Sequence, residues 1–491
     1  MGMLVTAVAQ LRFAASLVFG RSFSPWALER LIDALLETRH EFGTVGAEGI
    51  EQLAGPVLDE QDRQAMQLRR LRTQAVRAAQ ETVYYRRLFA GLALDPAHLS
   101  AADLAGLPLT RKEALREEPD AFVRTGATPA FRTTTTGTTG RPTGICFSAQ
   151  EMKLYSALGA LGLLARGEVT NEDIVQISTS ARATLGNTCF SRACERVGAL
   201  WYQTGLVEPG HALALLSEHH QLPGKKPRAS YLNTYASYLG QLVEYGLAAG
   251  YHPADFGLER ISVGGEVVTA GLKTRCQELF GPVRFLESYA MTETWPLGGM
   301  VCEQGHLHFE PSQGVLEVVS LDSAAPAQPG EVGTLVITPL PPYRETTILL
   351  RYNSEDVVRR LAGPVTCSLR HLPATTDLLG KLRLCVRHDL GWTYPREVLE
   401  ALEAVDAVPL PARCGFWAVP HGVAVEVVVR SATPTVRQVV EKSLADHRIP
   451  VQELRLVQDA RQLRHPLPLR CDLQELGFPE RPHLEVVPPR D

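Results

Sequence analysis

Lysine is scarce in this 491-residue chain: only seven of its 49 basic residues are lysines, and the rest are arginines. No basic tract occurs and the formal net charge is −5, so the composition gives no indication of a nucleic-acid partner. An uninterrupted apolar run of membrane length is also missing, because Gln10 and Arg12 break the apolar start of the chain. We therefore expect an amphipathic helix at residues 1–20 and no membrane span.

Regularly spaced cysteines are missing as well. The nine cysteines are odd in number and widely separated, which argues against the disulfide framework of a small secreted domain. A cytoplasmic protein is the expectation that follows. With 45% hydrophobic residues, the chain is long enough for a large core and for two or more domains.

The most distinctive segment that is present is the threonine-rich loop Thr133-Thr-Thr-Thr-Gly-Thr-Thr-Gly-Arg-Pro-Thr143. Gly137 and Gly140 allow close backbone approach, and the hydroxyl and N–H groups around them can enclose a phosphate chain. The loop is not of the Walker form, because no Gly-Lys-Ser/Thr follows the glycines. The alternative interpretation is a low-complexity surface loop.

Alternation of strands and helices predicts an α/β fold. Residues 173–179, 260–265 and 283–289 have the pattern of buried strands, and a helix is expected near residues 270–280. Such alternation favours a large N-terminal domain with a parallel or mixed sheet covered on both faces. Closely spaced apolar segments then indicate an antiparallel subdomain, with strands at 315–319, 334–338 and 347–350.

Helices are expected before the threonine-rich loop and after a domain boundary near Gly380. Residues 60–91 have helical periodicity, and Thr110 is expected to cap the next helix. Residues 1–379 would form the N-terminal nucleotide- and acid-binding domain, and residues 380–491 a small C-terminal α+β domain. The elements expected in the smaller domain are helices at 396–404 and 434–446 and strands at 416–430 and 451–458.

Two motifs end neighbouring strands of the expected sheet. Ser262-Val-Gly-Gly-Glu266 has paired glycines whose backbone can lie against a flat base, and Ser288-Tyr-Ala-Met-Thr-Glu293 ends the next strand. Ligands of open α/β sheets bind at the carboxyl ends of strands, so we expect Tyr289 to stack on adenine. Glu293 is expected to hold Mg²⁺ between phosphates, and Asp356 to accept both hydroxyls of a ribose.

Taken in order, these motifs resemble the phenylacetate–CoA ligase branch of the adenylate-forming enzymes. The resemblance covers most of residues 60–400 and includes Leu107-Pro-Leu-Thr-Arg-Lys112 and Arg351-Tyr352 with Asp356. It implies that ATP and Mg²⁺ activate a small carboxylic acid, often aromatic, as acyl-AMP, and that a thiol, usually of CoA, then takes the acyl group. It also implies catalytic roles for Thr138 and Glu293 and nucleotide contacts from Thr135, Thr136, Gly137, Thr138, Thr139, Gly140, Gly265, Glu266, Ser288, Tyr289, Thr292, Asp356 and Lys381.

The C-terminal part departs from the family pattern. The hinge motif Gly-Arg-x-Asp-Asp reads Gly380-Lys-Leu-Arg-Leu384, so both carboxylates are missing. The family also uses a C-terminal lysine during adenylation, whereas the matching position here is Pro466 and no lysine follows Lys442. Arg464 or Arg470 could substitute, although a guanidinium is not equivalent to an ammonium. Removing one such charge from a phosphate-type transition state costs on the order of 10²–10³ in rate.

Three functions therefore remain open on the sequence. The first is an acid-activating ligase whose acceptor is CoA, an acyl carrier protein thiol or an amine. The second is a degenerate relative that transfers an acyl group from acyl-CoA without ATP. The third is a non-catalytic binding module, against which the intact N-terminal motifs argue.

Two further groups of side chains are candidates for function. Arg182 and Asn187 follow an expected strand in a region where relatives form the acid pocket, so they are expected to contact the substrate. Two Cys/His pairs occur at Cys302-x3-His306-x-His308 and Cys367-x3-His371. Thiolate and imidazole suit tetrahedral Zn²⁺, and the expected ligands are Cys302, His308, Cys367 and His371. Buried cysteines and surface histidines are the alternative.

Overall fold

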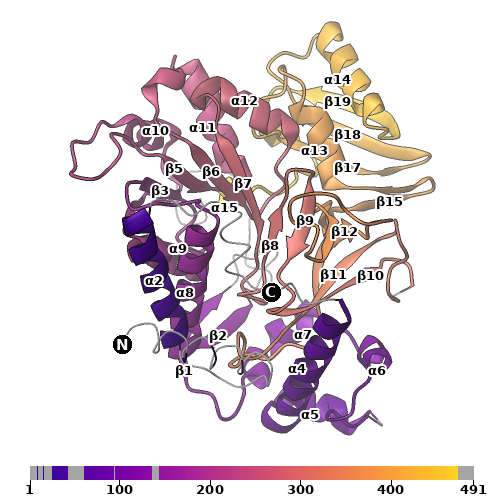
Figure 1. Ribbon diagram of the computed structural model, residues 1–491. Coiled ribbons are helices and arrows are strands. Elements are labelled where there is room, and N and C mark those ends of the chain that lie inside the picture. Colours follow the sequence, from indigo (N-terminus) through magenta and orange to yellow (C-terminus); the bar gives the residue numbers. More distant parts are fainter. Residues whose placement is uncertain are drawn as a thin grey trace.

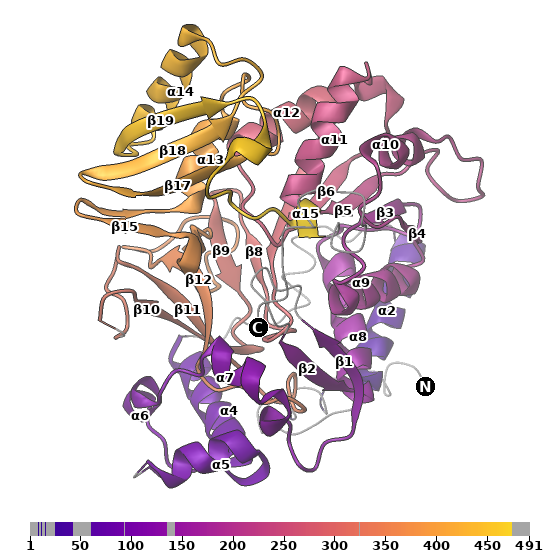
Figure 2. The same cartoon turned by 180° about the vertical axis from the view of Figure 1, so that it is seen from behind.

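The computed structural model of the chain describes residues 8, 11, 15, 25–42, 60–92, 94–134, 143–323 and 325–473. It shows a central sheet flanked by helices, with residues 386–457 forming a lobe at one end, the C-terminal lobe (Figures 1 and 2). Within the described residues, no helix combines the length and apolar character needed to cross a bilayer. Most of the predicted helix at 1–20 lies outside the described residues, and so do the predicted phosphate-binding residues Thr135, Thr136, Gly137, Thr138, Thr139 and Gly140.

The central sheet has eight strands in the order β13-β9-β8-β7-β6-β5-β3-β4. Strands β7, β6, β5, β3 and β4 run parallel, and β8, β9 and β13 extend the sheet in antiparallel fashion. This arrangement confirms the predicted mixed sheet. The strands are β3 Ile174–Ser178, β4 Leu200–Gln203, β5 Tyr231–Thr234, β6 Arg260–Gly264, β7 Arg284–Tyr289, β8 Gly299–Val301, β9 His306–Phe309 and β13 Ala374–Thr376.

Helices cover both faces of this sheet because its parallel strands are apolar on both sides. Along β3, Val175 and Ile177 belong to one buried cluster and Ile174 belongs to another, as the alternation of side chains in a strand requires. The first cluster is formed with α2 Trp26–Phe42, α8 Ala149–Ala165 and α9 Thr184–Val197. The second is formed with α10 Pro209–Ser217, α11 Ala236–Ala248 and α12 Ala270–Phe280.

A four-stranded antiparallel sheet follows, in the order β10-β11-β12-β14. Its strands are β10 Gly314–Ser320, β11 Val332–Pro339, β12 Tyr352–Arg359 and β14 Gly380–Lys381. Two of the three predicted strands are confirmed, but the strand predicted at 347–350 is wrong. Thr347 makes only an isolated bridge with Val123, and Ile348, Leu349 and Leu350 are at most 3% exposed within the first core cluster. The apolar character of this segment therefore serves core packing rather than strand pairing.

The helices before the threonine-rich loop also differ in part from the prediction. The expected helix at 60–91 is two helices, because Thr82 interrupts it and its Oγ1 accepts a hydrogen bond from the Tyr85 N–H (3.2 Å). Thr110 does not cap a helix; its hydroxyl donates to the carbonyl of Leu350 (2.6 Å) instead. The elements of this region are α4 Glu60–Glu81, α5 Val83–Ala90, α6 Ala101–Gly106, α7 Lys112–Glu117, β1 Pro129–Thr134 and β2 Gly144–Ser148.

The C-terminal lobe has a core of its own. Val398 and Leu402 of one helix pack with Val425 of a strand and Val440 of a second helix, and all four side chains are fully buried. The predicted helices and strands of this region are confirmed, with 416–430 divided into two strands. The elements that were predicted are α13 Pro395–Glu403, β17 Cys414–Val419, β18 Gly422–Val428, α14 Pro434–Asp446 and β19 Val451–Val457. The structure adds β15 Val386–His388, β16 Gly391–Thr393 and, after the lobe, α15 Arg470–Leu473, which were not predicted.

Candidate functional site

A cavity of about 680 Å³ lies at the carboxyl ends of β5, β6 and β7. Residues that directly follow these strands line it, and this volume is typical of small-molecule sites. Segments that are far apart in the sequence meet there, as the strand order predicts. The cavity is lined by these residues singled out from the sequence: Arg182, Asn187, Gly265, Glu266, Ser288, Tyr289, Thr292, Glu293, Asp356 and Lys381.

Asp356 is held between two other predicted residues. The Tyr289 hydroxyl donates to Asp356 Oδ2 (2.9 Å), and the ammonium of Lys381 lies 2.8 Å from Oδ1. Burial raises the pKa of Tyr289 well above its ordinary value, so the phenol keeps the proton that it donates. An ionised carboxylate has about four acceptor positions, and these two contacts leave about two for further donors such as a pair of hydroxyls.

The paired glycines allow β6 to end close against β7. A Cβ atom at Gly264 would lie 2.6 Å from the carbonyl oxygen of Ser288, and Gly265 has φ +77°, which disfavours any side chain. Beside the glycines, the hydrogen bond from the Tyr289 hydroxyl to Asp356 holds the Tyr289 ring in place. This ring also contacts the ring of Phe309 edge-on, with centroids 5.9 Å apart. The cavity therefore has a bare backbone and an aromatic ring on its wall, both suited to a flat base.

Glu293 is almost completely buried, at 3% exposure. The Tyr352 hydroxyl donates to its Oε1 (3.1 Å), and the ammonium of Lys112 lies 3.6 Å from the same oxygen. Lys112 begins α7 and also lines the cavity. Sequence reasoning assigned no role to Lys112; its place in the motif Leu107–Lys112 of a lysine-poor chain was the available indication.

Glu266 and Asn187 make hydrogen bonds within the protein, whereas Arg182 is exposed. Both oxygens of Glu266 accept hydrogen bonds from the protein, from Ser237 and from the backbone of Arg470. The Asn187 side chain is equally engaged, because its Oδ1 accepts from Thr179 (2.6 Å) and its Nδ2 donates to the carbonyl of Ser180 (3.1 Å). It thus shapes the turn before α9, whereas Arg182 is exposed where it lines the cavity.

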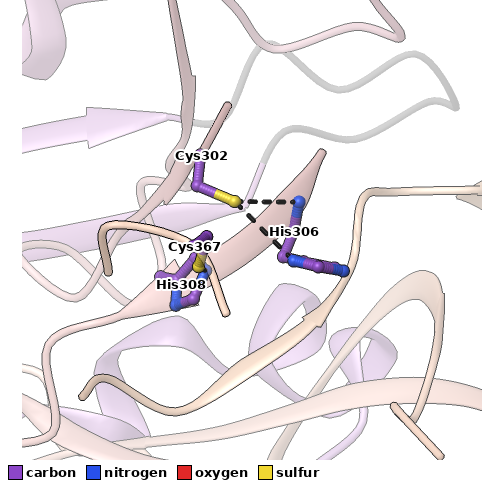
Figure 3. A group of neighbouring side chains, drawn as sticks. All are labelled: Cys302, His306, His308 and Cys367. Carbon is purple, nitrogen blue, oxygen red and sulfur yellow. Dashed lines mark hydrogen bonds between the residues drawn. The ribbon is translucent and has the colours of Figure 1, made fainter. Parts of the chain in front are cut away.

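A cluster of potential metal ligands is formed by side chains of β9 and of the loops around it (Figure 3). It consists of Cys302, His306, His308 and Cys367, whose ligand atoms all lie within 4.8 Å of one another. The sequence-based set named His371, which is exposed; the cluster contains His306 in its place.

The cluster has the chemistry of a tetrahedral two-thiolate, two-imidazole site. His308 Nε2 lies 3.2 Å from the sulfur of Cys367, and the sulfur of Cys302 lies 3.7 Å from His306 Nδ1. Desolvation lowers the pKa of His308, which favours the neutral ring that binds metal. His308 also lines the cavity, so the cluster supports part of its wall.

Comparison with known proteins identifies relatives of the chain. The family described as AMP-binding enzyme matches residues 59–339. The phenylacetate-coenzyme A ligase of Thermus thermophilus is 25% identical over 318 residues, which cover 63% of this chain and 68% of that protein.

The fold is also found among solved structures. A crystal structure of 2-hydroxyisobutyryl-CoA ligase in the postadenylation state, in complex with 2-HIB-AMP, has a TM-score of 0.68 at 16% identity, covering 86% of this chain and 92% of that chain. The same ligase with 2-HIB-AMP and CoA in the thioesterification state has a TM-score of 0.57 at 18% identity, with 82% and 87% covered. At these identities the likeness establishes the shared architecture.

Proposed function

This chain belongs to the AMP-binding enzyme family, and we propose that it joins a carboxylic acid, most suitably an aromatic one, to CoA through an acyl-adenylate. In the first step a carboxylate oxygen attacks the α-phosphorus of ATP, and the bond to pyrophosphate breaks. In the second step the sulfur of CoA attacks the acyl carbon, AMP leaves and the thiol proton passes to solvent. The observation that carries the proposal is the convergence of the separate motifs on one cavity.

The residues around the cavity divide between the nucleotide and the acid. We assign the ribose to Asp356, whose remaining acceptor positions match its two hydroxyls, and the base to the wall formed by Gly265 and Tyr289. The acid would lie toward Phe190 and Trp295, which line the same cavity and suit an aromatic ring. Residues 380–491 are proposed as the smaller domain. The C-terminal lobe within it has its own hydrophobic core, which starts with the side chains of α13.

The phosphates are assigned to the region of Glu293 and Lys112. Glu293 is a buried carboxylate that fits Mg²⁺, and that ion when bound would neutralise phosphate charge. The ammonium of Lys112 would supply the positive charge that the family takes from a C-terminal lysine. Thr138 and its neighbours, which follow β1 and precede β2 in the sequence, are also proposed to bind the phosphates.

Acid-dependent exchange of labelled pyrophosphate into ATP is the direct test. We expect exchange with aryl acids such as phenylacetate or benzoate, and several-fold weaker exchange with linear fatty acids. The exchange should require Mg²⁺. Addition of CoA should then yield the acyl-CoA thioester, detected by mass spectrometry. Absence of exchange with every aryl acid, together with acyl transfer from an aryl-CoA in the absence of ATP, would contradict the proposal.

We further propose that Cys302, His306, His308 and Cys367 hold one structural Zn²⁺. Purified protein is expected to contain about one zinc per chain by metal analysis, and Cys367→Ser to lose most of it. Since a bound ion stabilises the folded state, the same substitution should lower Tm by about 5 °C or more.

His371→Ala provides the matched control for the zinc site. His371 belongs to a Cys-x3-His pair in the sequence but lies outside the cluster, so this variant should keep its zinc and its Tm. Loss of zinc from His371→Ala with retention in His306→Ala would show that the ligand set is the one expected from the sequence spacing.

A further inference from the structure

The last described residues of the chain form an arm, residues 464–472, that joins the C-terminal lobe to the cavity. The backbone N–H groups of Arg464 and His465 donate to Glu426 of β18, and that of Leu467 donates to the carbonyl of Cys414 (2.8 Å). The arm then leaves this lobe. Figure 2 shows α15, in yellow, beside β5 and β6 and away from the rest of the yellow lobe.

The far end of the arm is anchored on the central sheet and its helices. Leu469 and Cys471 are 8% and 4% exposed and belong to the core formed with α11 and α12. The N–H of Cys471 donates to the Ser237 hydroxyl (3.1 Å) of α11. Asp472 keeps a link to the C-terminal lobe, because its carboxylate pairs with the guanidinium of Arg413 just before β17. These contacts hold the arm in place without any contribution from the side chain of Arg470.

The Arg470 side chain instead contacts the paired-glycine wall of the cavity. Its Nε–H donates to the carbonyl oxygen of Gly265 (2.7 Å), and its guanidinium lies 5.3 Å from the centroid of the Tyr235 ring. The Arg470 backbone N–H donates to Glu266 Oε1 (2.7 Å), while Oε2 of that carboxylate accepts from the N–H and hydroxyl of Ser237 (2.9 and 2.6 Å). Glu266 therefore fastens the arm beside the glycines.

We propose that Arg470 is a positioning residue for the nucleotide base. Gly265 has no side chain to restrict its backbone (φ +77°), so the peptide between Gly265 and Glu266, which carries the Gly265 carbonyl, can reorient at little cost and needs an external contact to keep one orientation. The charged hydrogen bond from Arg470 fixes the Gly265 carbonyl before the base arrives, and such preorganisation increases affinity. The proposal rests on the proposed function, because it assumes that ATP binds in this cavity.

Arg470→Met is expected to raise the KM for ATP about tenfold and to change kcat less than about threefold. The KM for the acid and the Tm should stay at their wild-type values, because the backbone contacts of the arm persist. Affinity for AMP, measured by calorimetry, should fall by the same factor. Arg470→Lys, which keeps the charge but not the planar fork, should fall between Met and wild type.

Arg461→Ala is the matched control, since Arg461 is exposed just before the arm and pairs with Asp459. It should behave as wild type. An unchanged KM for ATP in Arg470→Met overturns the proposal. An equal rise in the KM for ATP and the KM for the acid, together with a lowered Tm, also overturns it, because a residue that only stabilises the fold would have that effect. Wild-type protein that binds AMP without acid-dependent exchange would contradict the ligase proposal alone, and the Arg470→Met loss of AMP affinity would still be expected. Wild-type protein that binds no nucleotide would overturn both.

Discussion

Glu293→Gln is expected to slow acid-dependent pyrophosphate exchange by about 10²–10³-fold. The substitution keeps the size of the side chain and its bond from the Tyr352 hydroxyl, but it removes the buried charge assigned to Mg²⁺. The KM for ATP should rise less than kcat falls, because the metal matters most where charge moves between phosphate oxygens. Single-turnover formation of acyl-AMP over a Mg²⁺ titration would measure both quantities.

Two variants separate the charge of Glu293 from its surroundings. Tyr352→Phe removes only the hydroxyl donor and is expected to slow exchange less than about tenfold. Glu441→Gln removes an exposed carboxylate on α14 and should leave the rate unchanged. An exchange rate for Glu293→Gln within threefold of wild type would contradict the assignment of the metal to this carboxylate.

The sequence predicts those elements of the fold that depend on the pattern of neighbouring residues, and it fails where contacts between distant segments decide the structure. Strands β3, β6 and β7 were predictable because each is a short segment with apolar residues that is bounded by turn residues. The prediction failed at 347–350, where an apolar run fills the core between distant elements. It failed again at Thr110, whose hydroxyl bonds the carbonyl of Leu350, 240 residues away. Neither contact has a local sequence signature.

The cavity could be predicted in outline for a topological reason. Motifs that end neighbouring parallel strands must meet at one edge, which brings Gly265 and Tyr289 together. For the candidate metal site, the set of ligands expected from the sequence included His371 where the structure has His306. His306 and His308 are two residues apart in β9, so they share one face of the strand, and this spacing favours them over His371. Lys112 had no comparable spacing, because it approaches Glu293 only through tertiary packing.

Lys112→Met is expected to slow acyl-adenylate formation by about 10²-fold, because an ammonium beside the phosphates would be lost from a site that contains no C-terminal lysine. Transfer of the acyl group from preformed acyl-AMP to CoA should be affected less than about threefold, since no pyrophosphate leaves in that step. Single-turnover measurements of the two half-reactions would show this division. Lys112→Arg should recover only part of the rate, because a guanidinium is larger and differently hydrated.

Lys153→Met is the control for this prediction, since Lys153 is an exposed lysine on α8. If Lys112 and Glu293 act as a unit, the double variant Lys112→Met/Glu293→Gln should lose less than the product of the two single losses. A normal rate of adenylation in Lys112→Met would instead require another cation at the phosphates. Arg470 would then be the next candidate, and its substitution should lower kcat for adenylation rather than raise the KM for ATP.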